Sequence, residues 1–450
     1  MMFTAQEIAQ ATGGTLVGEN VSVSGVSTDT RTIERGMLFA AIKGESFDGN
    51  EFIAKAAENG AAAALSDRPP GSGAAGIPVI YADDTRRAQL ALARHYRERF
   101  AVKLCGVTGS VGKTSTKDMI YAALSAKYET LRTEGNFNND IGLPKTLFRL
   151  NESHGAAVIE MGMSALGEIS VLSRAAKPDV AVITNIGWCH LENLGTRENI
   201  LRAKLEILDG MTAGAEVIIN GDDELLRGAD YGKHTVVTYG FGEGCDIRAK
   251  DIESTENGGR FTLCAHGKRY AAAVPVEGEH HIRNALAAFA VGEAFGMTPE
   301  EIIPAFMRYQ GSGLRQKYVE CGKKTFILDC YNASPDSMKS SLSLIRTSPR
   351  RRVAVLGDML ELGEMSASLH AGIADLLVQS ADAAFLYGRE MRRCMERLKA
   401  LGGPRAFHTE DMEELVRLLR ENLRDGDIVL FKGSRGMRME QAAQALIDAE

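Results

Sequence analysis

A glycine-rich loop between a predicted strand and a predicted helix constrains this chain most tightly. The segment Leu104–Lys117 reads L-C-G-V-T-G-S-V-G-K-T-S-T-K, so an apolar run leads into glycines and then into Lys113 and Thr114. Such a strand–loop–helix junction directs backbone N–H groups and a helix N-terminus at one point, which suits a phosphate group. Lys113 would add a positive charge on the outer phosphates, and the Thr114 hydroxyl would be a magnesium ligand. The sequence therefore predicts a bound nucleotide.

The spacing inside this loop departs from the commonest phosphate-loop pattern, in which four residues separate the first glycine from the Gly-Lys pair. Gly106 lies one residue too far from Gly112, and Gly109 lies between them. A surface glycine turn before a helix is the alternative interpretation. The complete order of strand, loop and helix favours the phosphate loop.

Apolar strands and amphipathic segments alternate along most of the chain. With 450 residues it is too long for one ordinary core, and its length suggests about three domains. Residues 1–100 predict a small mixed domain, with helices near 51–58 and 85–100. From Val102 onward, near-continuous apolar strands separated by helices indicate a parallel sheet covered on both faces. These strands are expected at Val102–Val107, Ala156–Met161, Val180–Thr184 and Glu216–Asn220.

A second doubly wound pattern begins near Leu314 and lacks a phosphate loop of its own. The turn-rich segment 246–276, which precedes this third unit, is predicted to form short antiparallel strands. We therefore expect an α/β protein with a small mixed N-terminal domain (1–100), a central parallel-sheet domain of the phosphate-loop ATPase type (101–313) and a C-terminal Rossmann-like domain (314–450). The strands of this last domain are expected at Thr325–Asp329, Arg352–Leu356, Ala383–Leu386 and Ile428–Phe431.

Charge and cysteine content narrow the class of protein. The formal net charge of −7 gives no electrostatic reason to expect nucleic acid as a partner. Seven cysteines without a C-x-x-C pair predict neither a disulfide framework nor a structural zinc site, and reduced thiols fit the cytoplasm. The N-terminus lacks a signal-peptide pattern, and no apolar run approaches the roughly 18 residues of a membrane span. We therefore expect a cytoplasmic protein without a membrane span.

Polar side chains follow the predicted central strands where each strand ends. Glu160 closes one strand, and Asn185 and His190 follow another. Because ligands lie beyond the carboxyl ends of the strands in open parallel sheets, Glu160 and His190 could complete a magnesium site with Thr114. Magnesium prefers oxygen ligands, so His190 taken alone favours a structural role. Beside Thr114 and Glu160, the metal role is favoured.

Lys204 lies on the apolar face of a predicted helix. Ile200, Lys204, Ile207 and Leu208 follow the i, i+4, i+7, i+8 spacing of one helical face. The amine could reach solvent past its aliphatic stem. Alternatively, its charge could be neutralised, paired or chemically modified at a site. The spacing alone favours the first interpretation.

Two turns in the third unit are rich in side chains that bind ligands. Asp329 ends a strand and opens D-C-Y-N-A-S-P, and the turn K-G-S-R-G contributes Lys432, Ser434 and Arg435. Each could be an ordinary turn, but together they point to a site shared between domains. The N-terminal segment S-T-D-T-R (27–31) is equally consistent with a capped turn and with an anion contact.

These segments together resemble the Mur ligases, the ATP-dependent amide-forming enzymes of peptidoglycan precursor synthesis. The loop T-G-S-V-G-K-T (108–114) is similar to the phosphate loop of that family, which accounts for its spacing. That loop is shared with folylpolyglutamate synthases, whereas the blocks at 356–363 and 432–440 are much more specific. The other similar blocks are T-E-G-N-F-N-N-D-I-G-L-P (133–144), E-M-G-M-S (160–164), T-N-I-G-W-C-H-L-E (184–192) and A-K-L-E-I (203–207).

The resemblance implies a role for each matching residue. Catalytic roles fall to Lys113, Lys204, His190 and Arg315. The ATP contacts are Thr108, Gly109, Ser110, Val111, Gly112, Lys113, Thr114, Ser115, Asn284, Arg315 and Asp329. The Mg²⁺ ligands are Thr114, Glu160, His190 and Lys204, the last through a carbamate on its amine. The substrate contacts are Ser27, Thr28, Asp29, Arg31, Asn136, Asn138, Asn139, Asn332, Lys432, Ser434 and Arg435.

The blocks look most like those of the family member that adds D-Ala-D-Ala to UDP-MurNAc-tripeptide. The reaction implied is phosphorylation of the tripeptide carboxylate by ATP, followed by attack of the dipeptide amine on the acyl phosphate. The N-terminal domain would bind the UDP-sugar, the C-terminal domain the dipeptide, and the protein would be a monomer. The third residue of the tripeptide could be lysine or diaminopimelate.

Other functions stay open at this point. One is a different amide ligase of the same fold, either another Mur ligase or a folylpolyglutamate synthase. Another is a phosphate-loop ATPase that acts as a switch. Two positions also depart from the family pattern, and at the first of them an adenine-side contact is expected to differ. His281 stands where the family usually has asparagine after its histidine, and Asn50 stands where histidine is common.

Overall fold

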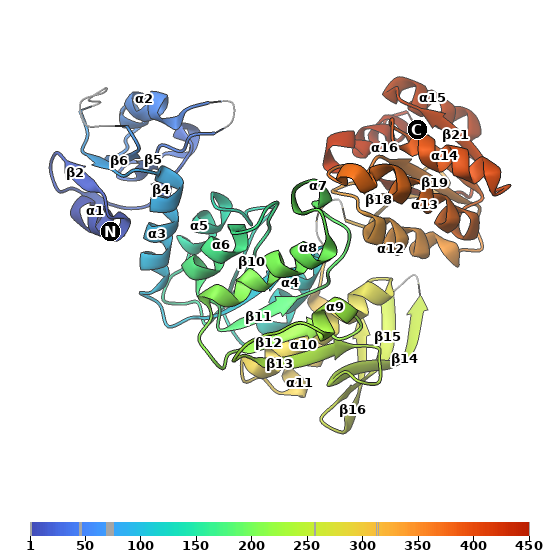
Figure 1. Cartoon of the computed structure of the whole chain (residues 1–450), viewed down its shortest axis with the longest axis horizontal. Coiled ribbons are helices and arrows are strands. Elements are labelled where there is room, and N and C mark those ends of the chain that lie inside the picture. Colours follow the sequence, from blue (N-terminus) through green and yellow to red (C-terminus); the bar gives the residue numbers. More distant parts are fainter. Residues whose placement is uncertain are drawn as a thin grey trace.

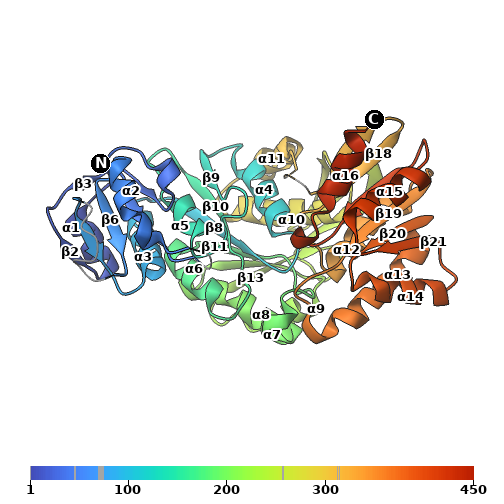
Figure 2. The same cartoon turned by 90° about the horizontal axis from the view of Figure 1, so that it is seen from above.

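The computed structural model describes residues 2–44, 47–68, 76–255, 258–311, 313 and 315–449, which fold into three α/β domains in a row (Figure 1). The N-terminal and C-terminal domains lie at opposite ends, with the central domain between them, and the view from above shows the same order (Figure 2). Leu314, at the predicted start of the third unit, lies outside the described residues. The predicted three-domain α/β fold is confirmed.

The N-terminal domain is small and mixed. Its larger sheet has the order β2-β7-β6-β5-β4 and is parallel except between β2 and β7. The helix predicted near 51–58 begins as a 3₁₀ turn at Gly49–Phe52. Its strands are β1 (Phe3–Thr4), β2 (Thr15–Val17), β3 (Ser22–Val23), β4 (Val26–Ser27), β5 (Leu38–Ala40), β6 (Ala63–Ser66) and β7 (Val79–Tyr81), and its helices are α1 (Ala5–Thr12), α2 (Ile53–Glu58) and α3 (Thr85–Arg97).

The central domain is built on a nine-stranded sheet with helices on both faces (Figure 1). Its strands are β8 (Lys103–Thr108), β9 (Thr130–Arg132), β10 (Ala156–Glu160), β11 (Val180–Ile183), β12 (Glu216–Asn220), β13 (Thr235–Gly240), β14 (Ile247–Thr255), β15 (Gly258–Ala265) and β16 (Lys268–Val274). Its helices are α4 (Lys113–Leu124), α5 (Gly142–Leu147), α6 (Glu168–Ala176), α7 (Leu191–Leu194), α8 (Arg197–Leu205), α9 (Glu224–Arg227), α10 (Glu279–Ala294) and α11 (Pro299–Ile302).

The strand order of the central sheet places the loops of the candidate site next to one another. This order is β16-β15-β14-β13-β12-β11-β8-β10-β9. β8 lies between β11 and β10, and all three are parallel. Their carboxyl ends therefore share one edge, with the phosphate loop flanked by Glu160 and by Thr184. The predicted antiparallel strands are confirmed as β14–β16, which extend the same sheet.

The C-terminal domain has a six-stranded sheet in the order β17-β18-β22-β19-β20-β21, parallel except at its β17 edge. The four strands predicted there from the sequence are confirmed. Its strands are β17 (Lys317–Cys321), β18 (Lys324–Asp329), β19 (Arg352–Gly357), β20 (Ala383–Tyr387), β21 (Arg405–Thr409) and β22 (Ile428–Lys432). Its helices are α12 (Pro335–Arg346), α13 (Ser366–Ser380), α14 (Met391–Ala400), α15 (Met412–Asn422) and α16 (Met439–Ile447).

Two whole-chain properties bear on function. All seven cysteines are free thiols, and burial raises the pKa of Cys105, Cys245, Cys330 and Cys394. Within the described ranges, no helix combines the length and the apolar character needed to cross a bilayer.

Candidate active site

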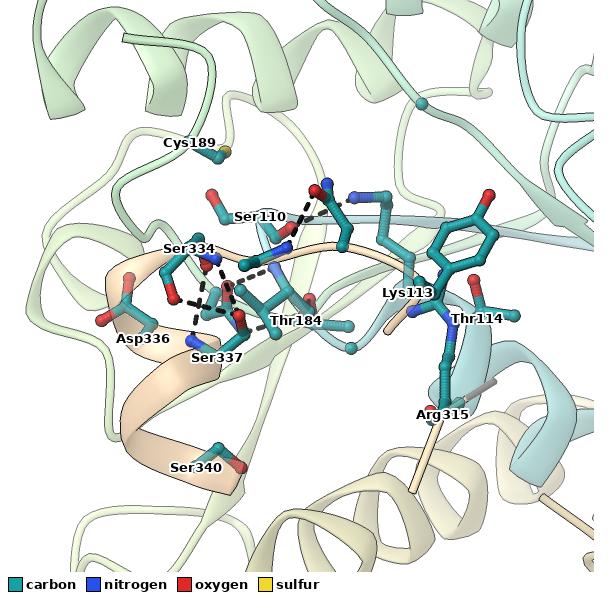
Figure 3. A pocket seen from close by; sticks show the side chains of 18 of the residues that line it. Ser110, Lys113, Thr114, Thr184, Cys189, Arg315, Ser334, Asp336, Ser337 and Ser340 are labelled. Atoms are coloured by element: carbon teal, nitrogen blue, oxygen red, sulfur yellow. Dashed lines mark hydrogen bonds between the residues drawn. The ribbon is translucent and has the colours of Figure 1, made fainter. Parts of the chain in front are cut away.

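A cleft of about 930 Å³ lies between the central and C-terminal domains. One wall contains the phosphate loop, and the start of α12 lies on the other (Figure 3). The ends of β18 and β22 also line this second wall. Polar groups of two domains therefore meet in one cavity. The predicted site residues that line it are Ser110, Val111, Gly112, Lys113, Thr114, Ser115, Asn138, Asn139, Glu160, His190, Asn284, Arg315, Asp329, Asn332, Lys432, Ser434 and Arg435.

The phosphate loop is held by the end of the neighbouring strand β11. Asn185 accepts a hydrogen bond from the Val111 N–H at 2.9 Å and donates to the Val111 carbonyl at 2.9 Å. The Thr184 hydroxyl donates to the same carbonyl at 2.7 Å. These bonds fix the loop just before α4, whose first-turn N–H groups have no intrahelical acceptors and are available to an anion.

Gly109 and Lys113 shape the inside of the loop. Gly109 has φ 143°, and a Cβ atom there would overlap the Thr184 hydroxyl, so only glycine fits. The Lys113 amine donates to the carbonyls of Gly109 at 2.8 Å and Ser110 at 3.2 Å, so it lies over its own loop (Figure 3). Burial lowers the pKa of Lys113. The lysine charge is thus held where phosphate oxygens would approach.

Glu160 lies on the other side of β8 and is 1% exposed. Its Oε1 accepts from the Asn138 amide at 2.8 Å, and its N–H donates to the Thr133 hydroxyl at 3.0 Å. Its Oε2 is buried and has no hydrogen-bond partner in the described part of the chain. A buried carboxylate oxygen left in this state is costly, so the site fits a cation.

Lys204 is fully buried, and its Nζ likewise has no hydrogen-bond partner among the residues described. Burial, with a further contribution from the charge of Lys113, lowers the pKa of Lys204 to about 7. The interpretation that this amine reaches solvent is therefore wrong. The helix also differs slightly from expectation, because α8 ends at Leu205 and a 3₁₀ turn continues over Glu206–Gly210.

His190 follows β11 and contacts the C-terminal domain. Its Nδ1 lies 2.6 Å from Oε2 of Glu361. The hydrogen bond to His190 lowers the pKa of Glu361. Across the described ranges, no group of three or more His, Cys, Asp or Glu side chains is placed to hold a metal ion. A magnesium centre at Glu160 and His190 would therefore need other ligands, such as Thr114, Lys204 and phosphate oxygens.

Asp329 and Lys432 form a buried ion pair on the opposite wall. They are partners in the parallel β18–β22 register, and Lys432 Nζ donates to Asp329 Oδ2 at 2.6 Å. The Ser341 hydroxyl donates to the same oxygen at 2.5 Å. Burial would raise the pKa of Asp329, but Lys432 and these hydrogen bonds outweigh it and lower the pKa. Lys432 also donates to the Asn332 carbonyl at 3.2 Å, which fixes the D-C-Y-N turn.

Other predicted contacts have structural partners around the cleft. The Arg315 guanidinium lies over the Tyr331 ring, 4.3 Å from its centroid. The Asn284 side chain accepts from the Thr116 hydroxyl at 2.8 Å, which ties α10 to α4. Further along the cleft, the Ser434 hydroxyl accepts from the Leu360 N–H at 2.9 Å, and Arg435 pairs with Glu440 at 2.9 Å.

Several predicted residues do not line the cleft. Thr108 is buried and donates to the Met161 carbonyl at 2.8 Å, and Gly109 forms the loop backbone. Lys204 lies beneath the cleft surface, whereas Asn136 is exposed. The N-terminal set Ser27, Thr28, Asp29 and Arg31 lies in the first domain.

The N-terminal turn is a capped turn, one of its two predicted forms. Asp29 caps a 3₁₀ turn at Thr30–Thr32 by accepting from the Arg31 N–H, and it also pairs with the Arg31 guanidinium at 2.6 Å. The hydrogen bond to Arg31 lowers the pKa of Asp29 to about 2, and Lys145 of the central domain contributes. The Asp29–Arg31 ion pair leaves the Arg31 guanidinium exposed on the surface. This geometry does not by itself indicate that Arg31 binds an anion.

The structure adds site residues that the sequence had not singled out. Asp336, at the start of α12, accepts from the Trp188 N–H at 2.9 Å and so joins the two domains. Glu361 and Gln316 also bridge the domains. Asp336 could have been predicted to stabilise its helix, because it is an acidic residue in the first helical turn. The partner of Glu361 is 171 positions away, so the sequence offered no signal for that contact.

Family models and individual proteins match this chain along its length. The models are "Mur ligase family, catalytic domain" at residues 22–97, "Mur ligase middle domain" at 107–292 and "Mur ligase, glutamate ligase domain" at 315–435. A UDP-N-acetylmuramoyl-tripeptide--D-alanyl-D-alanine ligase of Bacillus subtilis is 40% identical over 99% of this chain and 98% of its own length.

Solved structures agree. A crystal structure of MurF from Acinetobacter baumannii superposes with a TM-score of 0.91 at 33% identity, covering 99% of both chains. MurF from Thermotoga maritima in complex with ADP gives 0.85 at 28% identity, covering 95% of this chain and 97% of the other.

Proposed function

Because this chain belongs to the Mur ligase family, we propose that it joins D-Ala-D-Ala to the terminal carboxylate of UDP-MurNAc-tripeptide at the expense of ATP. The full-length similarity to ligases of that name supports this pair of substrates. The observation that carries the proposal is the shared cleft, in which the phosphate loop faces the Asp329–Lys432 pair of another domain. Such a cleft can bring a nucleotide and two further substrates together.

The reaction proceeds in two transfers. The γ-phosphoryl group of ATP moves to the tripeptide carboxylate, which forms an acyl phosphate and releases ADP. The amine of D-Ala-D-Ala then attacks the acyl carbon, the C–O bond to phosphate breaks, and the amine loses a proton. Phosphoryl transfer depends mainly on positioning and charge neutralisation, which Lys113 and Arg315 provide. Closure of the two domains over the cleft would keep water from the acyl phosphate.

Magnesium fits the residues beside the loop, because Glu160 Oε2 and Lys204 Nζ are both buried and lack partners within the described chain. We propose that Thr114, Glu160, His190 and a carbamate on Lys204 hold it. A neutral amine can attack carbon dioxide, forming an N–C bond and losing a proton, so a pKa of about 7 prepares Lys204 for this change. Bound magnesium would neutralise charge on the phosphate oxygens.

The remaining assignments follow from the same framework. The N-terminal domain, with Thr28, Asp29 and Arg31, binds the UDP-sugar, and the C-terminal domain, with Asn332, Lys432, Ser434 and Arg435, binds the dipeptide. Free thiols and the need for ATP favour the cytoplasm. We expect a monomer, since each chain carries both walls of the cleft.

The test is phosphate release from Mg-ATP with UDP-MurNAc-tripeptide, measured with and without D-Ala-D-Ala. We expect phosphate release that requires both substrates. Mass spectrometry should show a product heavier than UDP-MurNAc-tripeptide by the mass of two alanine residues. Tripeptides ending in lysine and in diaminopimelate are compared to define the substrate. Release without any acceptor would instead indicate an ATPase switch, and dependence on another amine would indicate a different amide ligase.

A further inference from the structure

Glu168, the first residue of α6, places a carboxylate on the wall of the cleft. Its Oε2 accepts a hydrogen bond from the Ser164 N–H at 2.7 Å, and its Oε1 accepts from the Ser164 hydroxyl at 3.0 Å. Within the described part of the chain, no ion pair joins Glu168 to a basic side chain. Because the side chain is half-buried and held by Ser164, a fixed negative charge faces the cavity.

The other carboxylates that line the cleft are already engaged or lie elsewhere on it. Asp223 caps α9, Asp336 accepts from a backbone N–H and belongs to the C-terminal wall, and Glu160 is the proposed magnesium ligand. The remaining three contact a basic side chain: Asp222 with Arg283, Asp329 with Lys432 and Glu361 with His190. Among the described residues of the central wall, Glu168 is therefore the carboxylate left for a cationic group of a ligand.

The helix that carries Glu168 adjoins the N-terminal domain. α6 packs against α3, the last helix of that domain (Figure 1). At the far end of α6, Nε of Arg97 on α3 donates to the Ala176 carbonyl at 3.0 Å. Glu168 thus lies on the side of the cleft that faces the proposed UDP-sugar domain, where a peptide attached to the UDP-sugar would enter.

Glu168 also lies close to the residues proposed to hold magnesium. The side-chain amide of Asn193, in the short helix that follows His190, donates to the Ser164 carbonyl at 3.2 Å. The charge of Glu168 reaches Lys204 as well: burial lowers the pKa of Lys204 to about 7, and the carboxylate opposes this effect. Since the tripeptide carboxylate would react beside this metal, its third residue is the part of the peptide nearest to Glu168.

The chemistry of that third residue is complementary to a carboxylate. Lysine and diaminopimelate both carry a side-chain amine, which has an ordinary pKa of about 10.4 in lysine and is charged at neutral pH. Ammonium and carboxylate groups form charge-assisted hydrogen bonds, which are stronger than neutral ones. We propose that Glu168 determines specificity for the third residue of the tripeptide by binding the ammonium group of its side chain, while Ser164 orients the carboxylate. The proposal rests on the proposed function, which supplies the tripeptide.

The test compares UDP-MurNAc-tripeptides that end in lysine and in norleucine, which has the same side chain without the amine. Their affinities for the whole protein are measured by calorimetry with magnesium and a non-hydrolysable ATP analogue, and ligation gives kcat and KM. We expect the lysine form to bind about tenfold more tightly, in line with one hydrogen bond between charged groups. Glu168→Gln keeps an oxygen acceptor for Ser164 but removes the charge. Its preference should fall to about twofold or less, while the KM for D-Ala-D-Ala stays unchanged.

Glu206→Gln is the matched control for a purely structural role. Glu206 accepts from the Gly167 N–H at 2.6 Å and the Ser170 N–H at 3.2 Å, so it stabilises the same start of α6, but it does not line the cleft. This variant should keep the preference for lysine.

Three results would overturn the proposal. One is equal affinity of the parent protein for the two tripeptides, and another is an unchanged preference in Glu168→Gln. The third is a rise of the KM for D-Ala-D-Ala alone in that variant, which would assign the carboxylate to the dipeptide amine. Failure of the proposed function is distinguishable from these results, because neither tripeptide would then bind or gain a dipeptide, and the assignment of Glu168 would fail with it.

Discussion

The imidazole of His190 in the central domain lies 2.6 Å from the carboxylate of Glu361 in the C-terminal domain, measured from Nδ1 to Oε2. An ionised carboxylate can only accept, so Nδ1 carries the proton of this hydrogen bond. Both residues adopt positive φ, 52° for His190 and 64° for Glu361, a conformation that non-glycine residues adopt at a cost. The C-terminal domain thus occupies Nδ1 of His190 and leaves Nε2 as the nitrogen that would bind the proposed magnesium ion.

Glu361→Ala should weaken the response to magnesium. Carboxylates that orient a metal-binding histidine typically contribute about 10- to 100-fold in metal affinity or activity, and we expect a loss in that range. Glu361→Gln keeps an oxygen acceptor and should lose less. The measurement is the initial rate of phosphate release against magnesium concentration. The matched control Glu364→Ala, at an exposed position three residues on, should match the parent protein, and an unaffected Glu361→Ala variant would contradict the assignment.

Lys204→Ala should reduce turnover by about 100-fold or more, as expected when one stabilising group is removed from a phosphoryl-transfer site. Small carboxylates such as formate should restore part of the activity if a carbamate is the acting group. A variant with full activity would remove Lys204 from the mechanism.

Carbamate formation on Lys204 should increase with pH. The pKa of about 7 means that the amine is largely protonated at pH 6, where it cannot attack carbon dioxide, and largely neutral at pH 8. Carbon-13 spectra with labelled bicarbonate should therefore show a carbamate signal that grows from pH 6 to pH 8 in the parent protein. Lys204→Ala is the control, and the same signal in that variant would assign it to another amine.

The strands around the phosphate loop could be predicted because their residues are almost continuously apolar. The run before the loop appears as β8, in which every residue after Lys103 is buried. Strand β13 escaped prediction because its first two residues, Thr235 and Val236, are exposed, so it lacks the pattern of a strand covered on both faces. The antiparallel strands extend the central sheet because β14 pairs in parallel with β13, a long-range choice that periodicity does not encode.

Site residues at the ends of strands could be predicted from the sequence. Contacts between residues of different domains could not. Lys204 shows the limit of periodicity, since its position on the apolar face was clear but the burial of its amine depends on packing around it. The contacts of Glu361 and Gln316 depend on how two domains are placed, which no local pattern contains. Asp329 and Lys432, by contrast, were both named as strand-end residues, and the β18–β22 register brings them together.

Gly109→Ala should abolish nucleotide binding, because the new Cβ would overlap the Thr184 hydroxyl and displace the loop. Gly214→Ala is the matched control: Gly214 also has positive φ, 88°, but its Cβ would meet no atom within 4 Å. That control should cost about 1–2 kcal/mol of stability from backbone strain and leave ADP affinity unchanged. Calorimetry with Mg-ADP and thermal unfolding separate the two effects. Equal ADP affinity in both variants would show that the contact with Thr184 does not shape the loop.

Lys432→Met should destabilise the C-terminal domain by about 3–5 kcal/mol, because it leaves the Asp329 carboxylate buried without its cation. Asp329→Asn in the same chain should recover much of that loss, since no buried charge then remains. The pKa of Asp329 is lowered in the folded state, so the pair's contribution is complete above the unfolded pKa of about 3.9 and is lost as pH falls through the lower folded value. Thermal unfolding at pH 7 and at progressively lower pH measures both effects. A double variant no more stable than Lys432→Met would show that the carboxylate is stabilised by its serine and backbone surroundings rather than by Lys432.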